Sequence, residues 1–95
     1  MFVQIAKVLP LVSRDYTDRQ GNNQKFYSKG FIFSTSEGTL YVEAVQEQAQ
    51  ELEKLGIKEK DCAMVQLGSV ARSYKDSSNN ERFSNEITIK RFVLV

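Results

Sequence analysis

Residues 25–55 read KFYSKGFIFSTSEGTLYVEAVQEQAQELEKL, and the spacing of their apolar residues changes part-way along. Residues 25–35 alternate between two faces, which predicts a strand, and residues 39–42 predict a second, shorter strand after a tight turn. Residues 43–55 instead show helical spacing, and Gly56 is typical of a helix C-terminus. The positions that carry these periods are Tyr27, Phe31 and Phe33 in the first strand and Val45, Ala49 and Leu52 in the helix.

The flanking residues predict three further strands. Residues 2–12 are rich in β-branched and apolar residues, and residues 62–74 and 83–95 also have strand character. The polar segments 13–24 and 75–81 are expected to be hairpin loops. The predicted order is three strands, one helix and two strands. Pro10 is expected at an edge or a bulge, Gly68 at a bulge, and Gly30 at a bend or at a place where another group approaches the backbone closely.

The composition limits the chemistry that the chain can perform. Its 95 residues predict a single domain, residues 1–95, with no His and one Cys. Imidazole ligands, His-based catalysis and cysteine-rich zinc sites are therefore excluded, and we expect neither a metal nor a cofactor. The low Cys count, the lack of a long apolar run and the lack of a secretory leader predict a cytoplasmic protein with no membrane partner.

Charge is distributed unevenly although the formal total is only +1. Residues 37–61, which include the predicted helix, hold seven acids and three lysines, for a net charge of −4. The other residues hold ten bases and five acids, for a net charge of +5. Positive charge is therefore expected on the strands and hairpin loops, where a phosphate backbone would bind.

Five strands with one helix between the third and the fourth match the OB-fold, an all-β Greek-key barrel. Two stretches also resemble bacterial single-stranded DNA-binding proteins. Phe31-Ile32-Phe33-Ser34-Thr35-Ser36-Glu37 is similar to the second strand of that family. Gly68-Ser69-Val70 followed by Arg72-Ser73-Tyr74-Lys75-Asp76 is similar to its fourth strand and loop.

The chain departs from that family in ways that point to its smaller members. It has no Trp, so Tyr74 stands where a tryptophan is common, and its last predicted strand is not followed by an acidic tail. These features are similar to those of small tail-less relatives, such as the primosomal replication protein or proteins of mobile elements. The resemblance implies sequence-tolerant binding of single-stranded DNA in replication, recombination or transfer, with RNA as an open alternative.

Such binding needs cations that contact phosphates and flat rings on which bases stack. The sequence interleaves the two kinds of residue in the hairpin loops and along the strands. The predicted phosphate contacts are Arg14, Lys25, Lys29, Arg72 and Lys75, and the predicted stacking residues are Tyr16, Phe26, Tyr74 and Phe83. Phe26 and Tyr27 point to opposite faces of one strand, and a shift of one residue would exchange their roles.

Two other function classes remain open at this stage. An enzyme is disfavoured, because the carboxylates at 15, 18, 76 and 81 lie in polar loops beside arginines and no nucleotide or nucleophile motif is present. We therefore predict no catalytic residue. An OB-fold module that binds another protein is the stronger alternative, with the acidic helix face or a strand edge as its surface.

The apolar run Phe92–Val95 predicts self-association. Such a segment is unfavourable in water and is expected to be buried in the barrel or in a subunit interface. A homodimer or homotetramer would supply that interface and would also add buried surface to a small core.

Overall fold

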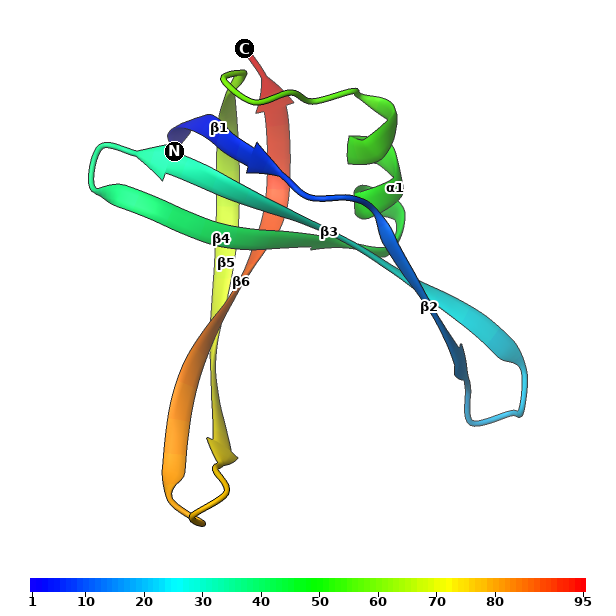
Figure 1. Ribbon diagram of the computed structural model, residues 1–95. Helices are drawn as coiled ribbons and strands as arrows, with labels where there is room; N and C mark the ends of the chain where they lie inside the picture. Colours follow the sequence, from blue (N-terminus) through cyan, green and yellow to red (C-terminus); the bar gives the residue numbers. More distant parts are fainter.

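Alternating apolar residues form the walls of a closed barrel in the computed structural model, which describes residues 1–95 (Figure 1). The elements are β1 (Phe2–Val8), β2 (Val12–Thr17), β3 (Asn23–Thr35), β4 (Gly38–Val45), α1 (Gln46–Lys54), β5 (Cys62–Lys75) and β6 (Glu81–Leu94). The strand order is β1-β5-β6-β4-β3-β2, and a further pairing of β1 with β3 closes the ring. All pairs are antiparallel except β4 with β6, which meet in the single parallel pair Glu43–Thr88.

The first predicted strand is divided at Pro10. Residues before the break pair with the end of β3, and those after it pair with the start of β3. Proline has no N–H for a ladder, so the chain can change direction there. The prediction of a loop over residues 13–24 was wrong in its extent, because Val12–Thr17 pairs residue by residue with Asn23–Ser28.

The helix begins three residues later than predicted. Residues 43–45 continue β4, which pairs with β3 as far as Val45 opposite Ser28. Val42 and Ala44 are both buried, so this segment follows the two-residue period of a strand. The tertiary pairing therefore overrides the helix-forming composition, and α1 begins at Gln46.

The core lies inside the barrel, with α1 at one end. Phe31, Phe33 and Phe92 pack against one another with ring centroids 5.9–6.4 Å apart. Ala49 and Leu52 are the buried residues of the helix, as predicted. Of the apolar run 92–95, only Phe92 packs against this core.

The molecule is extended because two hairpins leave the barrel, as Figure 1 shows. The radius of gyration is 15.4 Å, whereas a compact chain of this length is expected to have a radius of gyration of about 12 Å. We define arm 1 as residues 12–28 and arm 2 as residues 69–86. No helix of the structure has the length and apolar character needed to cross a membrane.

Candidate nucleic-acid interface

Both arms end in the same hydrogen-bonded turn. In arm 1 the Asp18 carboxylate accepts the backbone N–H groups of Gln20 and Asn22, each at 2.9 Å. In arm 2 the Asp76 carboxylate accepts those of Ser78 and Asn80, each also at 2.9 Å. Aspartates at such positions fix turns by mimicking backbone acceptors. Asp18 and Asp76, two of the four carboxylates at which acid–base chemistry is disfavoured, therefore hold the tips of the arms.

Three of the four predicted residues of arm 1, Arg14, Tyr16 and Phe26, fall on one side of the sheet. In an antiparallel pair, residues directly opposite each other share a face. Arg14 lies opposite Phe26, and Tyr16 follows two residues later on the same face. This face continues along β3 to Ile32, which pairs with Tyr41 of β4 on the outside of the barrel.

Arm 2 continues the same face beyond the contact between β4 and β6. Glu43, which is two residues from Tyr41 on β4, pairs with Thr88 of β6. On β6, every second residue from Thr88 back to Arg82 lies on the same side of the sheet as Thr88. Arg82 lies opposite Tyr74 of β5. The pairing of the strands therefore joins the two arms through the outer surface of β3 and β4.

We call this continuous side the aromatic face. Six of its side chains are large, apolar or aromatic, and 37–53% exposed: Val12, Tyr16, Phe26, Tyr41, Val70 and Tyr74. Single exposed apolar residues are ordinary on a protein surface, but a row that follows one face of a sheet marks a binding surface.

Gly30 allows Tyr41 to lie flat against this face. A Cβ atom at Gly30 would come within 2.8 Å of the Tyr41 hydroxyl oxygen and within 2.8 Å of Leu9 Cδ1. The Tyr41 hydroxyl donates a hydrogen bond to Glu43 Oε1 at 2.9 Å. Desolvation, together with this carboxylate, raises the pKa of Tyr41, so the phenol stays protonated. The close approach to the backbone that is one of the two alternatives predicted for Gly30 is made by the side chains of Tyr41 and Leu9.

Three of the predicted residues lie on the opposite side of the arms. Lys25 pairs with Asp15 in arm 1, whereas Lys75 pairs with Glu81 and Phe83 pairs with Ser73 in arm 2. All three side chains are exposed, and Phe83 is 71% exposed. They can reach solvent, but they do not share a surface with Tyr16, Phe26 and Tyr74.

Lys29 was predicted to contact phosphate, and its position rules that role out. Its side chain is only 6% exposed, and Nζ lies 2.5 Å from Glu53 Oε2 and 2.9 Å from the carbonyl oxygen of Leu9. The ammonium also lies 5.7 Å from the centre of the Phe31 ring. Lys29 therefore joins β3 to α1 and to the break that follows β1.

Besides Arg82, which lies on the aromatic face opposite Tyr74, two cations next to that face were not predicted from the sequence. Lys7 pairs with Ile32, and the side chain of Lys90 lies over Gly68, which pairs with Thr88. Both positions adjoin an irregularity in strand pairing, between Ile5 and Lys7 in β1 and opposite Gln66 and Leu67 in β6. A bulge reverses the inside–outside alternation, so the simple two-residue period gives no signal for these residues.

Ion pairs restrain two of the arginines. Arg72 Nε donates to Glu86, and Arg82 Nε donates to Asp76 Oδ2 at 2.9 Å. Both arginine side chains remain more than 60% exposed. A phosphate could therefore compete for them, since exposed ion pairs contribute little to stability.

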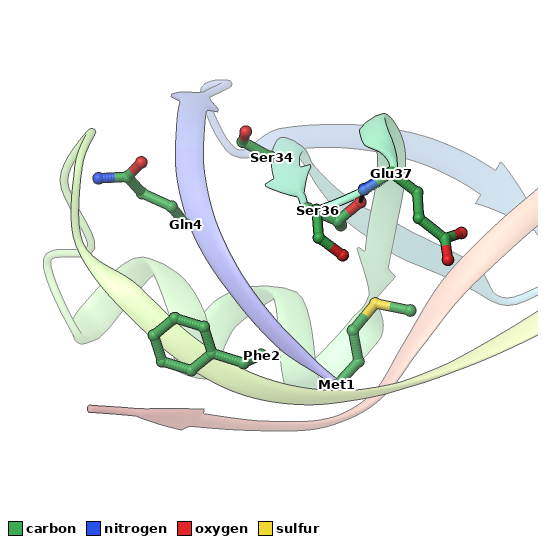
Figure 2. A pocket seen from close by; sticks show the side chains of 7 residues that line it. Met1, Phe2, Gln4, Ser34, Ser36 and Glu37 are labelled. Carbon is green, nitrogen blue, oxygen red and sulfur yellow. Dashed lines mark hydrogen bonds between the residues drawn. The ribbon is translucent and has the colours of Figure 1, made fainter.

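The largest hollow of the surface has a different character. It holds about 590 Å³ between β1 and the turn from β3 to β4, and it is lined by Met1, Phe2, Gln4, Ser34, Thr35, Ser36 and Glu37. Figure 2 shows the Glu37 carboxylate turned away from Phe2 across this space. The lining offers hydroxyl and amide groups and one carboxylate but no basic side chain, so it does not suit a phosphate group.

The topology and the position of the two arms can now be compared with known proteins. No protein-family model and no curated protein matches the chain. Among solved structures it is similar to the second OB-fold domain of replication protein A from Methanococcus maripaludis, with a TM-score of 0.58 and 15% identity. That similarity covers 99% of this chain and 79% of the other.

The chain has the OB-fold. This confirms the predicted all-β barrel with one helix, with the first of its five strands divided into β1 and β2. A similarity at this level of identity establishes the fold alone, because one fold hosts many activities. Membership of the bacterial single-stranded DNA-binding family remains a prediction.

Proposed function

We propose that the protein binds single-stranded DNA across the aromatic face, without strong sequence preference and without catalysis. The observation that carries the proposal is the single continuous face that joins exposed rings on both arms to the outer surface of β3 and β4. OB-folds bind oligonucleotides on this strand surface and on the loops that correspond to the two arms.

The chemistry of this face supports a single strand as ligand. Tyr16, Phe26, Tyr41 and Tyr74 offer rings to successive bases, each contact contributing about 1–3 kcal/mol. The cations on or beside the face are Lys7, Arg14, Arg72, Arg82 and Lys90. The carboxylates there are Glu43, Glu86 and Asp76, of which Glu86 is paired with Arg72 and Asp76 with Arg82. Both features suit a flexible strand whose bases are unstacked, whereas duplex DNA would hide its bases from the rings.

The first test is a fluorescence-anisotropy titration with labelled oligo-dT, the matching duplex and an RNA strand at two salt concentrations. We expect submicromolar, salt-sensitive binding of oligo-dT and much weaker binding of the duplex. The titration with RNA determines whether RNA is a second ligand. Absence of oligo-dT binding at low salt would reject the proposal and favour the protein-interaction module.

Arm 2 offers a matched pair of variants that tests which face binds. Tyr74 and Phe83 are exposed aromatics on the same hairpin but on opposite sides. We expect Tyr74→Ala to weaken oligo-dT binding about fivefold to a hundredfold, which corresponds to the loss of one stacked base. Phe83→Ala should change binding less than twofold. A larger loss of binding in Phe83→Ala than in Tyr74→Ala would place the ligand on the other side of the arm.

Arm 1 offers the equivalent pair for phosphate contacts. Arg14 lies on the aromatic face, whereas Lys25 lies on the opposite side beside Asp15. Loss of one contact to single-stranded DNA lowers the slope of log K against log salt by about 0.7. Arg14→Ala should show this decrease, and Lys25→Ala should not.

We further propose that two copies associate through an apolar stripe on the far side of the barrel. Phe2 pairs with Met64, and Met64 pairs with Val93, so the three side chains form a row across β1, β5 and β6. They are 57%, 47% and 62% exposed. A two-fold axis would bring the same stripe of each copy together and leave both aromatic faces free.

A further inference from the structure

A second, smaller hollow lies on the aromatic face at the base of arm 2. Its volume is about 250 Å³, and it opens where β4 and β6 diverge from their single pair, Glu43–Thr88. Tyr41 and Glu86, each two residues before that pair on its own strand, both line it. Arg72 of β5 contributes to the same lining.

The size of this hollow suits one planar ring. Sites for drug-sized ligands usually hold about 300–1,000 Å³, so this space is more appropriate to a single base than to a whole nucleotide chain. Tyr41 is 52% exposed and supplies an aromatic ring against which a base can stack. The hollow also lies between the two arms along the proposed path of the strand.

The charges within the hollow disfavour phosphate. Glu43 and Glu86 are both in the lining, and Arg72 is the only cation there. Each carboxylate accepts one hydrogen bond through one oxygen, Glu43 Oε1 from the Tyr41 hydroxyl and Glu86 Oε2 from Arg72. The second oxygen of each carboxylate has no protein donor and can accept a hydrogen bond from a ligand.

Carboxylate acceptors beside an aromatic ring recognise N–H groups on a base edge. Cytosine presents an exocyclic amino donor, which glutamate side chains accept in nucleic-acid complexes. Thymine presents a carbonyl oxygen at the equivalent position, and its one ring N–H donor lies between two carbonyl oxygens that repel a carboxylate. A carboxylate facing that carbonyl would lose its water without gaining a donor, which is unfavourable.

We infer that this hollow binds one base of the strand and favours a base with an exocyclic amino group, such as cytosine, over thymine. The inference rests on the proposed function, to which it adds a preference at one position. Binding along the rest of the aromatic face remains sequence-tolerant.

The test compares oligo-dC with oligo-dT of equal length at about pH 8, where cytosine is neutral. We expect the unmodified protein to bind oligo-dC about fivefold to tenfold more tightly. In the double variant Glu43→Gln, Glu86→Gln this ratio should fall to near one, while oligo-dT affinity rises because two negative charges are lost. The change in the ratio is the decisive quantity, since stacking elsewhere contributes to both proteins alike.

Glu81→Gln is the matched control, because Glu81 is an acid of the same arm on the opposite side and outside the hollow. It should leave the ratio unchanged. Circular dichroism and thermal unfolding establish that each variant is folded. A ratio near one in the unmodified protein, or a ratio that persists in the double variant, overturns the inference while oligo-dT binding still supports the proposed function. Failure to bind either oligomer overturns both.

Discussion

In the environment of Lys29, removal of its partner Glu53 should lower the free energy of unfolding more than removal of the lysine itself. The ammonium is buried and relies on Glu53 and on the Leu9 carbonyl, whereas the Glu53 side chain is 48% exposed. A carboxylate that loses its cation here can be solvated by water. A buried ammonium that loses its carboxylate remains away from water with one hydrogen-bond partner, which is the costly case.

We therefore predict that Glu53→Ala lowers the free energy of unfolding by about 1–2 kcal/mol, less than for a fully buried pair because Glu53 is partly solvated. Lys29→Met should change it by no more than about 1 kcal/mol, because methionine fills the same space without a charge. Urea unfolding measures both. Lys29→Met should also bind oligo-dT as the unmodified protein does, and a large loss of binding by a stable variant would return Lys29 to the interface.

The position of Lys29 could have been predicted from its neighbours. The alternation that places Tyr27, Phe31 and Phe33 on the inner side of β3 places Lys29 there too. Lysine side chains are usually exposed, which favoured a surface role for Lys29, but a lysine can be buried when a carboxylate pairs with it. Lys7 and Lys90 were not predictable in this way, since bulges decide which side they occupy.

At the level of elements, the sequence predicted the strands that bury a face. β3, β5 and β6 lie within about two residues of their predicted bounds, because their alternating apolar residues fill the barrel. β2 was missed because all six of its residues are exposed. Its stability comes from the hydrogen bonds and side-chain contacts that it makes with β3, and such a strand leaves no hydrophobic period to detect.

The tips of the two arms should respond to acid. Backbone hydrogen bonding, chiefly from Asn22, lowers the pKa of Asp18 below its ordinary value of 3.8. The Arg82 guanidinium and the N–H of Asn80 lower the pKa of Asp76 likewise. Because the folded-state values are lowered, each carboxylate stabilises its arm above the ordinary pKa, and that stabilisation is lost as pH falls through the lowered value.

NMR titration of the two carboxyl carbons and of the Asn22 and Asn80 amides measures this effect. We expect both carboxyl groups to titrate below pH 3.8, with the amide shifts following the same curves. Asp76→Asn should be less stable than the unmodified protein at about pH 7, and this difference should be smaller at about pH 2, because protonation of the native carboxyl increases as pH falls. A stability difference between Asp76→Asn and the unmodified protein that is equal at both pH values would contradict the assigned role of the charge.

At the scale of the whole molecule, two exposed surfaces lie on different parts of the barrel and would serve different partners. The aromatic face follows the arms, whereas the stripe of Phe2, Met64 and Val93 crosses β1, β5 and β6. Beside the stripe, a hollow of about 410 Å³ between α1 and the end of β6 adds Leu55 and Phe92 to the apolar surface. Association of two copies would bring two aromatic faces into one particle, and linked binding sites increase the affinity for a ligand long enough to reach both.

We predict that the protein is a dimer in light scattering after size-exclusion chromatography and that Met64→Lys makes it a monomer, because a lysine would be desolvated in the apolar interface. Phe83→Lys is the control, since Phe83 is more exposed than Met64 but lies on arm 2, away from the stripe. Met64→Lys should bind a short oligo-dT with unchanged affinity. It should bind a long oligo-dT more weakly by a factor of about ten or more, because avidity is lost. A monomeric unmodified protein, or a Met64→Lys variant that remains dimeric, would show that the stripe is not the contact between copies.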